Sequence, residues 1–246
     1  MNSPRLQLVS DTPGLSRYGA LAAALRARIV AGEWPPGTAM PSEQQLATDH
    51  QVALGTLRRA LESLAAQGLI ERVHGKGTFV RAGLTGSPLL RFFRFGQGTG
   101  EVPVSRILAR DRIAAPAAIS RRLGLGAGTQ VLRLRRLRLL QGQPCLLEEA
   151  WLPLPLFDAL ADSDPREWGD LLYPEYASRC GVHVHRAVDE VSFGTLAATQ
   201  ARQLALPAGH PSAVVSRHAF DLAGRCIEAR TSVGDAHAFH YTVTIT

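Results

Sequence analysis

Residues 53–78 combine arginines, a threonine and a lysine at spacings that suit contact with DNA. Arg58 and Arg59 fall outside the apolar stripe of a predicted helix, and Thr56 lies near its start. A guanidinium can donate to both acceptors of a guanine, and a threonine can bond a phosphate or touch a thymine methyl. The predicted DNA contacts are Glu43, Thr56, Arg58, Arg59, His74, Gly75, Lys76, Gly77 and Thr78.

Taken singly, each of these residues also suits a plainer role. The two arginines could form a solvated helix face, and the glycines around Lys76 could form a simple hairpin turn. Their arrangement on successive elements is what favours contact with DNA.

The elements expected to position these residues are a helix-turn-helix and a wing. Ser42, followed three residues later by Gln45, predicts a capping box that starts a short helix. A second helix over residues 53–67 carries an apolar stripe at i, i+3, i+4 and i+7 and ends at Gly68. Two apolar runs around a turn at residues 74–77 predict a β-hairpin. Such a helix fits the major groove, and a basic hairpin beside it can touch phosphates or the minor groove.

A second constellation lies further along the chain. Arg136 and Arg138 are two residues apart on a predicted strand and therefore share a face. On the returning strand, an even sum of paired residue numbers near 286 brings Glu148 to the arginines, and an odd sum brings Glu149. Two arginines and a carboxylate suit a small anionic or zwitterionic ligand. Spacing alone favours the alternative, an exposed ion pair worth under about 1 kcal/mol.

Composition indicates a globular chain of one large or two ordinary domains, with 246 residues, 46% of them hydrophobic and 20% charged. The pI near 9.9 permits a nucleic-acid partner. Three cysteines without a close pair fit a reducing cytosol. The sequence shows no membrane span and no signal peptide, so a cytoplasmic protein is expected.

Other suggestive patterns are expected to be structural. The glycines at residues 124–128 lead from a helix into a strand, the reverse of a dinucleotide-binding loop. No nucleophile motif supports hydrolase chemistry, and no cofactor is expected.

No metal site is expected either. Cys180, His183 and His185 could ligate a metal by type, but a fourth ligand is not evident, so we interpret them as unrelated side chains. The same interpretation applies to His237 and His240.

The expected organisation is a DNA-binding domain at residues 15–81, a linker at 82–88 and a second domain at 89–246. Long strand pairs with few helices predict an α+β domain on an antiparallel sheet. Strands are expected at residues 104–112, 131–140, 145–152, 182–193, 213–222, 226–233 and 241–245, and helices at 16–31, 116–123, 168–180 and 197–204.

The stretch 18–80 resembles the winged helix of the GntR family of bacterial transcription regulators. One departure is at residues 52–54, where Val-Ala-Leu replaces the family's Val-Ser-Arg. The matching residues are Pro36-Gly37, Pro41-Ser42-Glu43, Leu46-Ala47, Val52, Thr56-Leu57-Arg58, Ala60-Leu61, Gly68-Leu69-Ile70 and the run from Gly75 to Val80.

The second domain resembles the UTRA ligand-sensing domain of the HutC subfamily, which looks like chorismate lyase in fold. The family's C-terminal tyrosine-and-arginine string is absent here, where Gly234-Asp235-Ala236-His237-Ala238 stands. The matching residues include Arg136-Leu137-Arg138, Gly142-Gln143-Pro144, Glu148, Leu152-Pro153, Leu172-Tyr173, Asp221 and Glu228. The effector-binding residues that this resemblance implies are Arg91, Arg136, Arg138, Glu148, Tyr173 and Glu228.

The two resemblances imply a ligand-responsive repressor that binds a palindromic operator as a homodimer and is released by a small effector. The implied partners are double-stranded DNA, the effector and a second copy of the chain, with no membrane. Two alternatives stay open: a chorismate-lyase-like enzyme fused to a DNA-binding domain, and an architectural protein that binds DNA without sequence preference.

Overall fold

The computed structural model describes residues 16–81 and 102–240, and contacts divide the chain into two units, residues 1–83 and 84–246. The predicted linker at 82–88, the residue Arg91 and the predicted strand at 241–245 lie outside the described residues. Within the described parts, no helix is both long and apolar enough to cross a bilayer.

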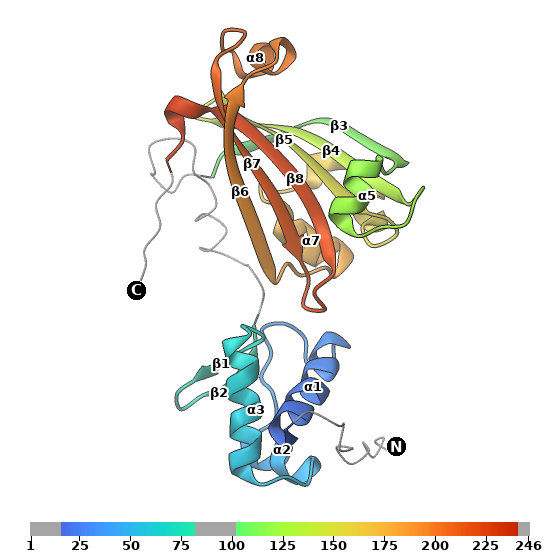
Figure 1. Cartoon of the computed structure of the whole chain (residues 1–246), viewed down its shortest axis with the longest axis vertical. Helices are drawn as coiled ribbons and strands as arrows, with labels where there is room; N and C mark the ends of the chain where they lie inside the picture. The colour runs from blue at the N-terminus through green and yellow to red at the C-terminus, as the bar shows by residue number, and fades with distance from the viewer. Residues whose placement is uncertain (1–15, 82–101, 241–246) are drawn as a thin grey trace. The chain divides into compact units, whose positions relative to one another are not determined.

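The N-terminal unit is a three-helix fold with a two-stranded wing (Figure 1). The wing strands pair antiparallel, with Ile70 opposite Val80 and Val73 opposite Gly77. The elements are α1 Arg17–Val30, α2 Glu43–Asp49, α3 Leu54–Ala66, β1 Ile70–Val73 and β2 Gly77–Val80.

Local sequence explains where these helices begin and which side they bury. The Ser42 hydroxyl accepts a bond from the backbone N–H of Gln45 at 3.2 Å, as expected of a cap at the start of α2. Helix α3 ends before Gly68, whose φ of +73° suits glycine. The predicted apolar stripe of α3 is fully buried, so its opposite side is free to face a partner; the stripe comprises Leu57, Ala60, Leu61 and Leu64.

The wing is tied to the rest of the unit by an extended segment that sequence periodicity did not predict. Ala39 forms a β-bridge with Phe79, and the Met40 N–H donates to the Thr78 carbonyl at 2.8 Å. The wing turn needs glycine, because Gly75 and Gly77 have φ values of +73° and +116°. The extended segment thus holds the β2 side of the wing.

The C-terminal unit is built on a six-stranded antiparallel sheet in the order β3-β4-β5-β8-β7-β6. This is the predicted α+β class. The strands are β3 Val104–Ala114, β4 Gln130–Leu140, β5 Gln143–Pro153, β6 Arg186–Thr195, β7 Pro211–Phe220 and β8 Cys226–Asp235. The helices are α5 Ala117–Leu123, α6 Asp158–Asp162, α7 Leu172–Cys180 and α8 Ala198–Leu204.

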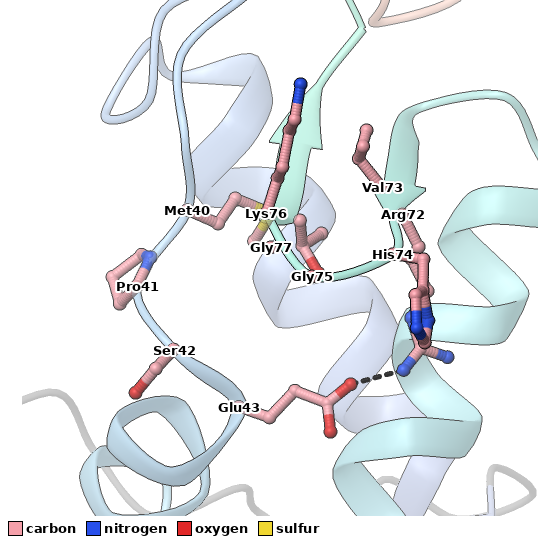
Figure 2. A pocket seen from close by; sticks show the side chains of 11 residues that line it. Met40, Pro41, Ser42, Glu43, Arg72, Val73, His74, Gly75, Lys76 and Gly77 are labelled. Atoms are coloured by element: carbon pink, nitrogen blue, oxygen red, sulfur yellow. Dashed lines mark hydrogen bonds and ion pairs between the residues drawn. The ribbon is translucent and has the colours of Figure 1, made fainter.

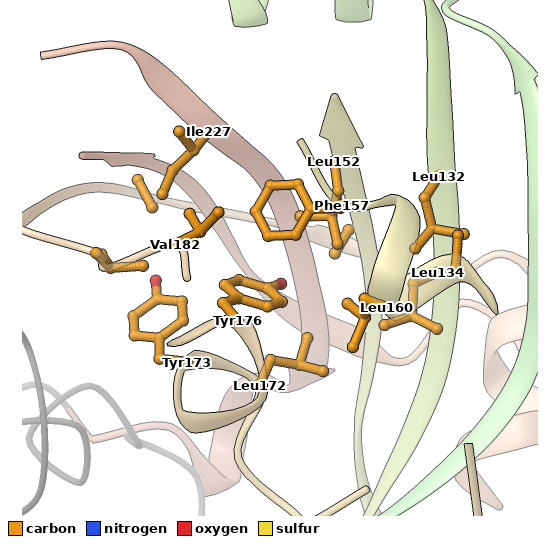
Figure 3. Packing of buried hydrophobic residues seen from close by; sticks show 14 residues of the cluster. Leu132, Leu134, Leu152, Phe157, Leu160, Leu172, Tyr173, Tyr176, Val182 and Ile227 are labelled. Atoms are coloured by element: carbon orange, nitrogen blue, oxygen red, sulfur yellow. The ribbon is translucent and has the colours of Figure 1, made fainter. Parts of the chain in front are cut away.

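Helices cover both faces of this sheet because successive strand residues point to opposite faces and apolar residues occur on both. Helices α6 and α7 pack on the face that presents Leu132, Leu134, Ala150 and Leu152 (Figure 3). Helix α5 packs on the opposite face, against Val131 and Trp151. Helix α8 covers another part of that second face, around Leu137 and Leu147.

Some elements differ from the sequence expectation. Helix α7 begins at Leu172 rather than near 168, and α6 was not predicted. Strand β6 begins at Arg186 rather than 182, because Gly181 ends α7 in the left-handed region and the next residues turn into the core. Val182 and Val184 are buried there, so their alternation reflects packing and not strand pairing.

Candidate DNA-binding surface and buried charge cluster

The open side of α3 carries the predicted DNA-reading arginines. Arg58 and Arg59 are both exposed, and the side chain of Arg58 is 54% accessible. Thr56 is half-buried, and it lines a shallow hollow with Arg59 and Arg17 at the start of the helix. The structure thus leaves two arginines and one hydroxyl available on a single helix face.

Glu43 joins α3 to the wing. Its carboxylate accepts a bond from Arg58 Nε at 2.8 Å and an ion-paired bond from Arg72 of β1, seen in Figure 2. The bond with Arg58, helped by Arg72, holds the pKa of Glu43 below its ordinary value despite partial burial. Glu43 is a predicted DNA contact, and in the structure its carboxylate pairs with two arginines, Arg58 and Arg72.

A groove runs between the start of α2 and the wing, lined by residues 40–43 and 72–78 (Figure 2). His74 and Lys76 are exposed on its wing side. Thr78 differs from its neighbours because it is only 8% exposed, which leaves its side chain little access to a phosphate. Arg72 was missed from the sequence, since only the fold brings it to Glu43.

The predicted sensor residues meet on one face of the sheet. Arg136 pairs with Glu148 in the β4–β5 register, so the pair numbers sum to an even value. At the turn, Leu140 pairs with Gln143, which gives an odd sum. An extra residue at Cys145, a β-bulge, changes the parity and turns Glu148 toward the arginines. Glu149 lies on the other face, 3.9 Å from Arg135.

The Arg136–Glu148 pair is buried, so the alternative of an exposed cross-strand pair is wrong. Glu148 Oε2 lies 2.6 Å from Arg136 Nη2, and the side chains are 3% and 4% exposed. Glu148 Oε1 is also 3.5 Å from Arg230 Nη1 and accepts from Ser232 Oγ at 3.3 Å. Burial would raise the pKa of Glu148, but Arg136 and the other arginines lower it to about 2.

Glu228 is the second buried carboxylate of the cluster. It pairs with Arg230 Nη2 at 2.6 Å and accepts a bond from the Tyr176 hydroxyl at 2.5 Å. The Tyr173 hydroxyl also donates to it, at 3.5 Å. Burial, reinforced by the charge of Glu228, raises the pKa of Tyr173 to about 12, so this phenol stays protonated.

Arg138 lies beside Arg136 and is 1% exposed. It donates to the carbonyl of Asp170, in the segment that leads into α7. Burial and the neighbouring charge of Arg136 lower the pKa of Arg138 to about 10. The guanidinium remains charged at neutral pH, but at an electrostatic cost.

Two further arginines complete the cluster and were not predicted. Arg230 shares a face with Glu228 because the two are two residues apart on β8. Arg217 lies directly opposite Arg230 on β7 and bonds Asp189 Oδ2 at 2.6 Å. The i, i+2 spacing from Glu228 could have revealed Arg230, whereas Arg217 required the β7–β8 register.

Arginines outnumber carboxylates among the buried members of this cluster, and the partly buried Asp189 pairs with Arg217 at its edge. Its buried members are the arginines Arg136, Arg138, Arg217 and Arg230 and the carboxylates Glu148 and Glu228. Within the described residues, the buried Nε atoms of Arg136 and Arg230 have no hydrogen-bond acceptor. Arg91, the sixth predicted effector residue, lies outside the described parts of the chain.

Comparison with known proteins gives this architecture a family. Residues 17–80 match the bacterial regulatory proteins of the gntR family, and residues 98–240, more than half of the chain, match the UTRA domain. The chain belongs to the GntR family. This GntR protein is therefore a DNA-binding transcription regulator with a UTRA domain, which confirms the predicted fold class and family.

Three relatives illustrate the range of similarity. The HTH-type transcriptional regulator SmoD of Agrobacterium fabrum is 32% identical over 73% of this chain and 75% of its own length. The "Probable fructoselysine utilization operon transcriptional repressor" of Escherichia coli O157:H7 is 30% identical over 78% of this chain and 79% of its own. The mannosyl-D-glycerate transport/metabolism system repressor MngR of Escherichia coli K12 is 31% identical over 58% and 61%.

A solved structure resembles the GntR protein along nearly its whole length. PhnF from Mycobacterium smegmatis is 26% identical, covers 92% of this chain with 98% of its own, and superposes with a TM-score of 0.55. The similarity thus extends over both units of the chain.

Proposed function

We propose that this GntR protein is a repressor that leaves a palindromic operator when a small anionic or zwitterionic effector binds the buried charge cluster. It acts as a homodimer whose two winged helices read half-sites about one helical turn apart. On each winged helix, Arg58 reads a base and Lys76 contacts the phosphate backbone.

The observation that carries the proposal is the buried excess of arginine over carboxylate. Four buried arginines face two buried glutamates and the partly buried Asp189, and two guanidinium Nε donors have no acceptor within the described residues. Leaving buried hydrogen-bond donors without acceptors is costly, so an anion that reaches these Nε atoms gains hydrogen bonds as well as attraction to the arginines. An effector with a carboxylate or phosphate and several hydroxyls fits this demand.

The names of two relatives agree with that chemistry. They refer to fructoselysine and to mannosyl-D-glycerate, both of which carry a carboxylate. A sugar-derived acid or an amino-acid conjugate is therefore the class to test first.

Release from DNA follows from a shift between two populations of the dimer. An effector that binds the operator-free arrangement more tightly moves the equilibrium toward it. A coupling of about 1–3 kcal/mol would weaken operator binding roughly 5- to 150-fold.

The test is an operator-release screen over carboxylated and phosphorylated sugars, followed by calorimetry with Arg138→Ala. The variant should still bind operator DNA but should no longer release it, because the winged helix is untouched. Arg135→Ala is the matched control, since Arg135 lies on the other face and its side chain is 43% exposed. Equal effector affinity in the parent and Arg138→Ala would reject the buried cluster as the effector site.

We propose that the domain binds the effector and releases it chemically unchanged. The relatives described above are transcriptional regulators, which favours a sensing domain without turnover. Mass spectrometry of the effector after long incubation tests this directly. Conversion of more than one effector molecule per chain would instead favour the lyase-like alternative.

A further inference from the structure

Two histidines and an aspartate converge at the end of β8, outside the charge cluster. His210 Nε2 lies 2.8 Å from Asp235 Oδ1, and the rings of His210 and His237 are 5.4 Å apart. The three potential ligand atoms all lie within 4.8 Å of one another. Among the described residues, they form a group with the types and proximity that a metal ion needs.

The backbone fixes each of the three positions. His210 follows Gly209, a residue with φ of +75°, and its carbonyl accepts from the Leu196 N–H at 2.9 Å. Asp235 ends β8 opposite Ser212. The same Asp235 Oδ1 accepts from the His237 N–H at 2.9 Å, so it caps the short turn that carries His237.

The donor set has a definite metal preference. Two imidazoles and one carboxylate suit Zn²⁺ and similar divalent transition ions, and they leave a fourth position for water. Metal–ligand bonds of about 2.0–2.2 Å place tetrahedral ligand atoms roughly 3.3–3.6 Å apart. The present separations, from 2.8 Å to at most 4.8 Å, bracket that value. Small side-chain rotations would therefore bring the three atoms to binding distance.

The group is accessible from solvent. The side chains of His210 and Asp235 are 18% and 27% exposed, and His237 is exposed. An ion can thus enter and keep a bound water. Asp235 and His237 also lie in the run Gly234–Ala238, where the chain departs from the family's C-terminal string.

We propose that His210, Asp235 and His237 form a site for one divalent transition-metal ion of the Zn²⁺ class. A bound ion fastens the segment after β8 to the turn that precedes β7. The site is separate from the effector cluster, because Asp235 lies two residues after Val233 on β8 and so shares its face, which is the α8 face. The proposal does not depend on the identity of the effector.

The experiment titrates Zn²⁺ and Co²⁺ into tag-free, chelator-treated full-length protein, using calorimetry and the visible Co²⁺ spectrum. The parent should bind one ion per chain and show the absorption of a low-coordinate Co²⁺ site. His210→Ala and His237→Ala should each lower the affinity by at least about tenfold, since even indirect metal partners contribute 10- to 100-fold. Asp235→Asn should also lower it while keeping an oxygen that can cap the turn.

His183→Ala is the matched control, because it removes a partly exposed histidine at another place on the domain. It should bind the ion as the parent does. The proposal is overturned if the parent shows no saturable binding at one ion per chain, or if His210→Ala and His237→Ala bind as tightly as the parent. It is also overturned if the variants lower the melting temperature while Zn²⁺ fails to raise that of the parent, because the group is then only a hydrogen-bonded cap.

Discussion

The two units use arginine in opposite ways. On the winged helix, Arg58 and Arg72 share Glu43 and have side chains that are 54% and 40% exposed. In the sensor unit, Arg136 pairs with Glu148 at a similar distance, but its side chain is only 3% exposed. The same ion pair therefore sits in water in one unit and in a low-dielectric interior in the other.

This difference separates two modes of recognition. An exposed guanidinium is hydrated and screened by salt, so it can exchange its carboxylate partner for phosphates or a base edge at little cost. A buried guanidinium has lost its hydration and depends on nearby charges. The winged helix is thus suited to a long polyanion, and the sensor to one small anion that fits a fixed set of charges.

The largest expected effect tests this contrast on two adjacent carboxylates. Glu148→Ala should destabilise the protein by about 3–5 kcal/mol, because Arg136 and Arg230 stay buried but lose the carboxylate that pairs with them. Glu149→Ala should cost under about 1 kcal/mol, because its pair with Arg135 is exposed. Urea unfolding followed by tryptophan fluorescence measures both. Similar losses for the two variants would remove the distinction between buried and exposed pairs.

Acid should reveal the same buried charge. The pKa of Glu148 is lowered from an ordinary 4.5 to about 2, so its stabilising contribution is present above about pH 4.5 and is lost as the pH falls toward 2. The contribution is roughly 3 kcal/mol at neutral pH. Unfolding free energies measured across this window should fall steeply for the parent and less for Glu148→Gln. Parallel profiles would contradict the lowered pKa.

Much of the winged helix could be predicted from the sequence because its signals are local. The Ser42 cap, the stripe beginning at Leu57 and the stop at Gly68 each act within a turn or two of helix. The predicted helix at 53–67 and the observed Leu54–Ala66 accordingly agree to within one residue at each end. The bridge from Ala39 to Phe79 joins distant residues and had no local signal.

The sensor cluster was less predictable, because strand register decides which residues share a face. The bulge at Cys145 turns Glu148, and not Glu149, toward Arg136, and periodicity alone leaves both registers open. Arg217 enters through pairing between β7 and β8. The residue types can be read from the sequence. Whether they lie on one face of the sheet depends on the extra residue at Cys145 and on the pairing of β7 with β8.

A smaller effect is expected where a single exposed arginine reads a base. Arg58→Ala should weaken binding to the specific operator by about 1–3 kcal/mol, roughly 5- to 150-fold. Arg58→Lys keeps the charge but not the two-pronged geometry, so it should retain nonspecific affinity and lose base preference. Glu43→Gln should also reduce the preference for the specific operator over other duplexes, because Arg58 loses the charge of its carboxylate partner. Gel-shift titrations with specific and scrambled duplexes would show this, and an unchanged ratio for all three variants would exclude Arg58 from base reading.

The smallest effect concerns Lys76 at the wing tip. If Lys76 contacts one phosphate, Lys76→Ala should weaken binding to every duplex alike and reduce the slope of log affinity against log salt by about one, since each neutralised phosphate contributes about 0.9. Arg26→Ala removes the same charge from an exposed position on α1, away from the groove residues, and should leave the slope unchanged. Fluorescence anisotropy over a salt series measures both variants. A changed base preference in a binding-site selection would show that the wing reads sequence. The winged helix would then have two base-reading elements, α3 and the wing.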